Sequence, residues 1–140
     1  MTITKRNCLY AINIFIPLVF GLFIYLTKAE RSYVSDLFSY FQIVFRPINY
    51  PDIIKSYACD FLWAYSLLFV LFIVIGIYKK NLKLSIIISV LFAVMIESIQ
   101  LFQTNMFTFD VIDIVVEIIA IALASLTIII FERKVIIWRS

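Results

Sequence analysis

Histidine is absent from this 140-residue chain, and both cysteine and charge are scarce. The two cysteines, Cys8 and Cys59, are far apart and lie in or beside apolar runs, so the short spacings of zinc sites and CxxC redox motifs are missing. Charged residues make up 15% of the chain, hydrophobic residues make up 64%, and the mean hydropathy is +1.07. Because a soluble domain could not cover so much apolar surface, the composition excludes a soluble fold and indicates an integral membrane protein.

Four long apolar runs account for this composition, and each is bounded by charge or by a polar turn. They cover residues 8–27, 58–78, 84–103 and 110–131, close to the ~20 residues that a helix needs to cross a bilayer. Short connections after the second and third runs favour antiparallel neighbours. The sequence therefore predicts an all-α polytopic membrane protein, with four transmembrane helices in an antiparallel bundle forming one domain over residues 1–140. The first run is too long for a signal peptide h-region and is interpreted as a retained anchor.

The longest connection joins the first two runs and is mixed in character. Between residues 33 and 45 its apolar side chains recur at spacings of three and four, which predicts an amphipathic helix that Pro47 and Pro51 then end. This helix in the first outer loop either lies in the membrane interface or caps the polar side chains described below. The sequence leaves both roles open.

Basic residues indicate the orientation, because Lys and Arg are enriched in cytoplasmic loops. The two chain ends and the connection at 79–83 carry eight of them, whereas the other side of the predicted bundle carries four. Both termini are therefore predicted to be cytoplasmic. The basic residues form short clusters between apolar runs, so the net charge of +3 is a topology signal and does not indicate a nucleic-acid partner.

Acidic side chains gather on the opposite side of the predicted bundle, because all nine acids except Glu132 fall there or in the outer halves of the helices. Spacings of three and four place the acids at the start of the fourth helix on one face, and Glu97 shares a face of the third helix with Gln100. A tight turn makes these faces neighbours. The candidate site residues are Asp60, Glu97, Gln100, Asp110, Asp113 and Glu117, with Trp63 and Tyr65 as further lining residues.

The cost of burying these acids argues for a shared polar pocket. A carboxylate in the middle of a transmembrane helix costs about 2.5–3.5 kcal/mol, and like charges four residues apart repel further. The acids must therefore face inward and be neutralised by protonation, hydrogen bonds, basic partners or a bound cation. Arg46 and Lys55 precede the second helix and are the expected counter-ions. The sequence predicts an outward-opening acidic pocket.

Several candidate residues also suit purely structural roles. Asp110 suits a helix N-cap, and Asp60 suits an interfacial acid at the start of a helix. Glu97 and Glu117 lie too deep for capping, so their structural role would be an interhelical hydrogen bond. Gln100 fits a packing hydrogen bond better than a ligand contact, and the two aromatic candidates also fit an interfacial belt.

Three short segments, in this order and spacing, resemble the VanZ-like family of small membrane proteins. They are DFLWAYSL at 60–67, ESIQ at 97–100 and FDVID at 109–113. The resemblance spans roughly residues 51–124, and the residues that match the family pattern are Asp60, Glu97, Gln100, Asp110 and Asp113. The chain departs from the pattern with Phe107 in place of a common Arg, Glu117 in place of Asn, and Ala120 and Ala124 in place of glycines. Losing that Arg removes a natural counter-ion.

The resemblance implies a multi-pass protein of the bacterial cytoplasmic (inner) membrane, acting in the cell envelope. The family is similar to proteins linked to antibiotic resistance, namely reduced susceptibility to teicoplanin-like lipoglycopeptides. The spacing of the residues alone does not show such a role.

Three functions fit an acidic pocket of this kind. The first is binding or modification of a surface or lipid-linked molecule, with a lipid-linked cell-wall precursor or a cationic amphiphile as the partner. The second is an enzyme with Glu97 or Asp113 as general acid or base and a divalent cation as its one cofactor, although histidine, GxSxG and P-loop motifs are missing. The third is a small proton- or cation-coupled carrier, which would work as a homo-oligomer. Binding ranks first.

Overall fold

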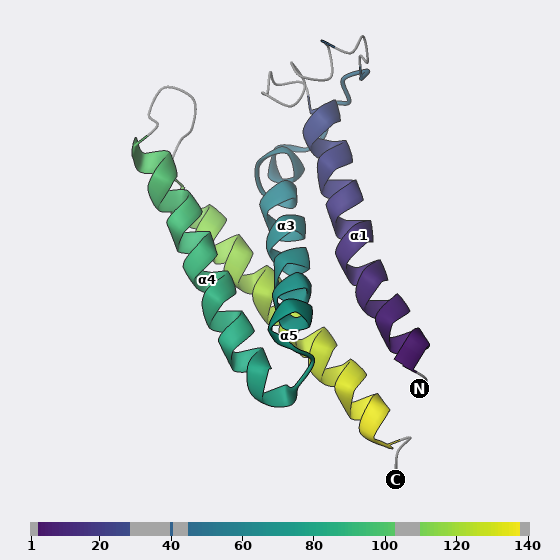
Figure 1. Cartoon of the computed structure of the whole chain (residues 1–140). Coiled ribbons are helices and arrows are strands. Elements are labelled where there is room, and N and C mark those ends of the chain that lie inside the picture. Colours follow the sequence, from purple (N-terminus) through teal and green to yellow (C-terminus); the bar gives the residue numbers. More distant parts are fainter. Residues whose placement is uncertain (1–2, 29–39, 41–44, 103–109, 138–140) are drawn as a thin grey trace.

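The computed structural model describes residues 3–28, 40, 45–102 and 110–137 (Figure 1). Its four helices are α1 (Ile3–Thr27), α3 (Asp52–Ile75), α4 (Lys79–Phe102) and α5 (Val111–Ile137). Each of the four contains a stretch that is long and apolar enough to cross a membrane. The predicted all-α bundle of four candidate membrane-spanning helices is therefore confirmed.

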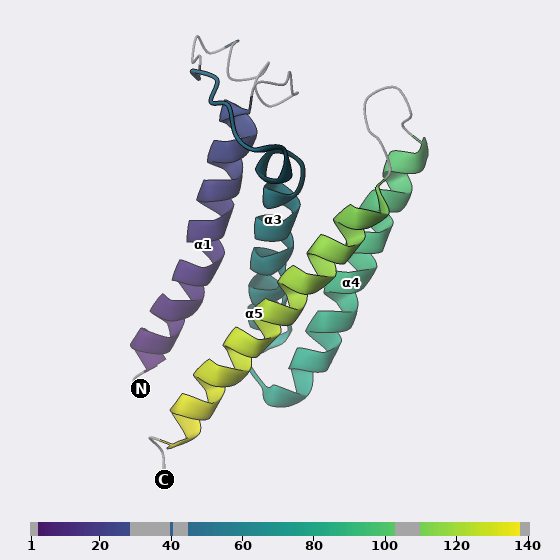
Figure 2. The same cartoon turned by 180° about the vertical axis from the view of Figure 1, so that it is seen from behind.

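Helix α3 is the central element of the bundle. It packs against α1, α4 and α5, and α4 also packs against α5. Successive helices run in opposite directions, so that the two chain ends and the α3–α4 turn lie at one end of the bundle (Figures 1 and 2). We call this the terminal end and the opposite one the loop end. This antiparallel arrangement follows from the short connections that the sequence shows.

The helices do not stop where the apolar runs stop. Helix α1 begins at Ile3 instead of residue 8, and α3 begins at Asp52 instead of residue 58. Backbone hydrogen bonding continues through charged residues, whereas hydropathy marks only the apolar part of a helix. At its other end α3 stops at Ile75, three residues before the predicted end, because Gly76 adopts a φ of +112° that favours glycine.

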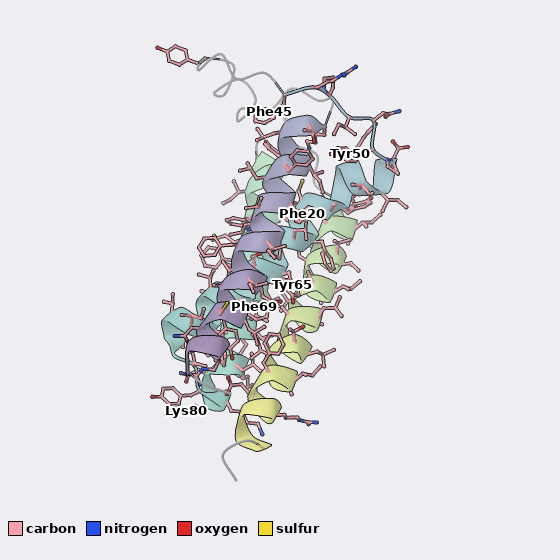
Figure 3. The ribbon with its side chains drawn as sticks, turned by 90° about the vertical axis from the view of Figure 1, so that its right-hand side faces the viewer. Phe20, Phe45, Tyr50, Tyr65, Phe69 and Lys80 are labelled. Atoms are coloured by element: carbon pink, nitrogen blue, oxygen red, sulfur yellow. The ribbon has the colours of Figure 1, made fainter. Side chains whose placement is uncertain are left out.

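The segment before α3 returns to the end of α1. The Ile48 N–H donates to the Thr27 carbonyl at 2.8 Å, and the hydroxyl groups of Thr27 and Tyr50 lie 2.8 Å apart. Figure 3 shows Tyr50 near the loop end and Lys80 at the terminal end. These bonds fix the start of α3 beside the end of α1. The amphipathic helix predicted at 33–45 falls almost entirely outside the described residues, so its role stays a prediction.

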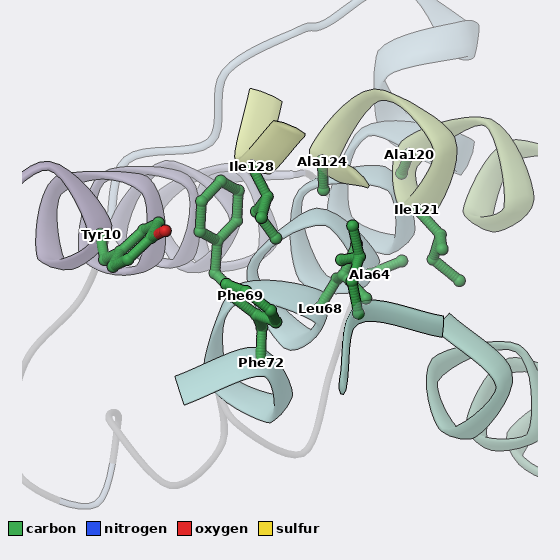
Figure 4. Close-up of a cluster of buried hydrophobic side chains, with 10 residues drawn as sticks. Tyr10, Ala64, Leu68, Phe69, Phe72, Ala120, Ile121, Ala124 and Ile128 are labelled. Carbon is green, nitrogen blue, oxygen red and sulfur yellow. The ribbon is translucent and has the colours of Figure 1, made fainter. Parts of the chain in front are cut away.

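The core is formed mainly by α3 and α5, and Tyr10 of α1 joins it (Figure 4). Ala120 and Ala124, one turn apart on α5, are fully buried, and Ala64 on α3 is nearly so. In a bilayer, helices associate by close van der Waals packing and not by hiding apolar surface from water, so small residues at this spacing let two backbones approach. The alanines are therefore the packing contact that holds α5 to α3.

Adding bulk at this contact should weaken the bundle. We expect Ala124→Leu to lower the free energy of unfolding by about 1–3 kcal/mol, because the extra methylenes force neighbouring side chains and backbone apart. Ala122→Leu is the matched control, since Ala122 lies on the exposed face of the same helix. The measurement is denaturant unfolding in bicelles followed by circular dichroism. Equal losses in both variants would show that α5 does not pack through its alanine face.

Candidate functional site

Four carboxylates from three helices converge toward the loop end. Asp60 comes from α3, Glu97 from α4, and Asp113 and Glu117 from α5. Each interacts electrostatically with others of the set, so the groups lie within range of one another's charge. Glu97 is 2% exposed and Glu117 is 3% exposed, whereas the two aspartates are partly buried. We call these four residues the acidic cluster.

The two buried glutamates differ in their hydrogen bonding. The Glu97 carboxylate accepts a hydrogen bond from the backbone N–H of Asp110, which ties the end of α4 to the start of α5. The Oε2 atoms of Glu97 and Glu117 are both buried and have no hydrogen-bond partner among the described residues, so the bond to Asp110 is what distinguishes Glu97. A buried polar atom that lacks a partner costs about 1–3 kcal/mol, and more when it is charged. Glu117 is therefore the least satisfied member of the acidic cluster.

Asp110 has a structural role at the start of α5. Its Oδ1 accepts the backbone N–H of Ile112 at 2.9 Å, which is the hydrogen bond of a helix N-cap. Its Oδ2 accepts the hydroxyl of Tyr57 from α3 at 3.4 Å. The capping role that the sequence allowed is therefore present, and the Tyr57 contact joins the second turn of α3 to the start of α5.

Among the described residues, Lys28, which directly follows α1, is the cation that interacts electrostatically with Asp60. Lys55 instead pairs with Asp52 at 3.9 Å on the surface, and Arg46 is exposed. Five residues separate Lys55 from Asp60, which turns them about 140° apart around the helix. Proximity in sequence was therefore a poor guide to the counter-ion, because α1 packs against the face of α3 that carries Asp60.

A groove of about 430 Å³ lies between α1 and α3, directly beside Asp60. Its lining residues are Pro17, Leu18, Gly21, Leu22, Tyr25, Cys59, Asp60 and Trp63. We call it the α1–α3 groove. Among these described lining residues Asp60 is the only charged one. The groove is therefore an apolar channel with one carboxylate in its wall.

Gly21 sets the spacing of the helices at this groove. A Cβ atom at this position would lie 3.6 Å from the Cβ of Leu62, and the Cys59 thiol donates to the Gly21 carbonyl at 3.5 Å. These contacts bring the two backbones close together on one side of the groove. Trp63 of α3 is 50% exposed and also lines the groove. The predicted lining residue Trp63 thus lies beside Asp60.

The remaining predicted site residues lie elsewhere. The Tyr65 hydroxyl donates to Asn13 Oδ1 at 2.8 Å and lies 3.5 Å from Thr127 Oγ1, so it links α1, α3 and α5 midway along the bundle (Figure 3). Tyr65 is thus placed in an interhelical network and not in the acidic cluster. The side chain of Gln100 falls outside the described residues, so its role stays a prediction.

Three contributors to the site escaped the sequence analysis. Lys28 follows the first apolar run directly, and Tyr57 precedes Asp60 by three residues, so helical spacing could have placed it on the same face. Nothing in the sequence pattern identified Gly21 as the point where α1 approaches α3. The groove depends on that approach, which is a tertiary contact.

The carboxylates of the acidic cluster lie close enough together for their charges to interact, but the described side chains are not arranged as a metal-binding site. Among the described residues, no group of three or more Cys, Asp or Glu side chains is arranged to hold a metal ion. Comparison with known proteins adds no assignment, because no protein-family model, curated protein or solved structure matches the chain.

Neutralising the least satisfied glutamate should relieve repulsion in the acidic cluster. We expect Glu117→Gln to raise the unfolding temperature of the ligand-free protein, because the amide keeps the shape of the side chain and removes one of several interacting negative charges. Asp52→Asn is the control and should change stability by less than about 0.5 kcal/mol, since Asp52 forms only a surface ion pair.

Thermal unfolding in detergent, followed by circular dichroism, measures both variants. A marked loss of stability in Glu117→Gln, with Asp52→Asn unchanged, would mean that the Glu117 charge itself holds the helices together.

Proposed function

We propose that this chain is a VanZ-like membrane protein of the cell envelope that binds a cationic amphiphile. In this proposal the positive head group lies against Asp60, and the apolar chain lies along the α1–α3 groove. The observation that carries it is the position of Asp60, a single carboxylate in the wall of an otherwise apolar groove. The three other acids of the cluster interact electrostatically with Asp60.

The size and access of the groove suit such a ligand. Its volume of about 430 Å³ is within the ~300–1,000 Å³ of typical small-molecule sites. Leu22 and Trp63, which line it, are about half exposed on the outer surface of the bundle. An amphiphile already dissolved in the bilayer could therefore enter sideways, without passing through water.

The charge of the site selects a cation over an anion. Four carboxylates interact there with one another, and Lys28 interacts with one of them, Asp60. In a medium of low dielectric constant this excess of negative charge attracts a positive head group strongly. A lipid-linked wall precursor carries phosphates and would need a bridging cation, so it is the less favoured partner.

The family resemblance supports the same site. Of the residues that match the VanZ-like pattern, Asp60, Glu97 and Asp113 belong to the acidic cluster, and Asp110 caps the helix beside it. Basic residues at the terminal end favour cytoplasmic termini, which would open the cluster toward the outer leaflet of a bacterial cytoplasmic membrane. A part in the response to teicoplanin-type lipoglycopeptides is consistent with binding of amphiphiles at this outer site.

The enzyme and carrier alternatives rank lower. Glu97 and Asp113, the candidate acid and base, do not line the α1–α3 groove. For a carrier, protons or ions need a polar path across the bundle. The buried side chains of α5 between Glu117 and Thr127 are Ala120, Ile121 and Ala124, an apolar interval of about 15 Å. The buried Ser66, Ser85 and Ser89 of α3 and α4 add neutral hydroxyl groups but no ionisable side chain.

The binding proposal can be tested with the tryptophan in the groove wall. In a Trp138→Phe background, Trp63 is the only tryptophan of the chain. A long-chain amine brominated on its alkyl chain, added to neutral-lipid bilayers, should quench Trp63 fluorescence at lower concentration than the matching brominated alcohol. Asp60→Asn should weaken binding of the amine by about tenfold or more, because the substitution removes the charged partner of the amine. Quenching by the alcohol should stay unchanged.

Asp52→Asn is the matched control, since it removes an exposed carboxylate from the same helix outside the groove. It should leave quenching by the amine unchanged. Equal quenching by the amine and the alcohol in the background protein would refute the proposal, as would retention of the amine preference in Asp60→Asn.

A further inference from the structure

A second groove, of about 400 Å³, lies at the terminal end of the bundle between α3, α4 and α5. We call it the basic groove. Its floor is apolar, and the residues of that floor are Phe72, Leu82, Ile86, Ile128 and Ile129. Its charged lining residues are Lys79, Lys83, Glu132 and Arg133. The groove therefore combines an apolar channel with a rim that carries three cations.

The cations are presented by a fixed piece of backbone. Lys79 and Lys83 lie four residues apart, at the start of α4, and so share one helix face. The turn before them is held by Asn81, whose side-chain amide donates to the carbonyls of Ile75 at 3.1 Å and Gly76 at 3.0 Å. Arg133 approaches from α5 on the other side. The cations of the rim therefore come from two helices, α4 and α5, that pack against each other, and the turn that leads into α4 is fixed by the Asn81 hydrogen bonds.

The single acid among the described lining residues is engaged elsewhere. The Glu132 carboxylate accepts a hydrogen bond of 2.6 Å from the Tyr10 hydroxyl of α1. The negative charge of Glu132 therefore offsets the positive charge of the rim only in part. With three cations and one acid among its described lining residues, the groove carries a net positive charge. This charge is complementary to an anion.

We propose that the basic groove binds an anionic phospholipid of the surrounding bilayer. The phosphate lies among Lys79, Lys83 and Arg133, and an acyl chain follows the apolar floor. The candidate membrane spans of α4 and α5 are Lys79–Ile99 and Val111–Arg133, so the cations sit where these spans end, at the depth of lipid head groups. Basic pockets between transmembrane helices at this depth recognise anionic head groups. The site lies at the opposite end of the bundle from Asp60 and does not depend on the function proposed above.

Native mass spectrometry of the detergent-purified protein tests this site. Wild type should bind phosphatidylglycerol more tightly than phosphatidylcholine of the same acyl chains. Each cation near a membrane surface strengthens the binding of an anionic lipid roughly fivefold. The triple variant Lys79→Gln/Lys83→Gln/Arg133→Gln should therefore bind phosphatidylglycerol on the order of a hundredfold more weakly than wild type. All three side chains are exposed, so the lipid-free variant should unfold at the wild-type temperature.

Lys80→Gln is the matched control. Lys80 belongs to the same turn, but it lies 5.9 Å from the Tyr78 ring centroid and does not line the groove. It should keep wild-type affinity for phosphatidylglycerol, and soluble glycerol phosphate should bind far more weakly than the lipid. Equal affinity for both lipids, an unaffected triple variant, a loss of about fivefold or more in Lys80→Gln, or tight binding of glycerol phosphate would each overturn the proposal.

Discussion

The need to keep carboxylates out of lipid governs this structure. A charged side chain at the centre of a bilayer costs several kcal/mol when it faces hydrocarbon, so helices that carry such groups must turn them toward one another. Here α3, α4 and α5 each direct acids toward a common region, and Glu97 and Glu117 are almost wholly buried there. The orientation of these helices about their own axes follows from that requirement. The same rotation decides which faces remain for lipid.

Close packing between the helices stabilises the orientation that buries the carboxylates. Ala120 and Ala124 bring α5 against α3, and Gly21 brings α1 against α3 near Leu62. Small side chains at both contacts let the central helix touch its neighbours without large apolar residues between the backbones. The resulting bundle has few polar links through its middle, chiefly the contacts of Tyr65 with Asn13 and Thr127. Specific hydrogen bonds and small residues therefore fix the helix register.

The two ends of the bundle present opposite charges beside apolar grooves. At the loop end Asp60 stands in the wall of the α1–α3 groove, and at the terminal end Lys79, Lys83 and Arg133 surround the basic groove. Each arrangement places charged side chains among the apolar residues that line a groove. The proposed binding of amphiphiles depends on this combination of shape and charge, in a chain with no histidine and without a recognisable nucleophile motif.

The sequence alone determined the class of the protein and the approximate limits of its helices. Length, hydropathy and short connections were enough for four antiparallel helices, because each helix closes its own backbone hydrogen bonds and needs no partner to be identified. Spacings of three and four likewise assigned the acids to shared faces. Only tertiary structure decided that Lys28, and not Lys55, faces Asp60, that Tyr65 belongs to an interhelical network, and that two grooves exist. These features depend on how one helix is rotated and spaced against another, and residues distant in sequence, such as Gly21 and Leu62, set that spacing together.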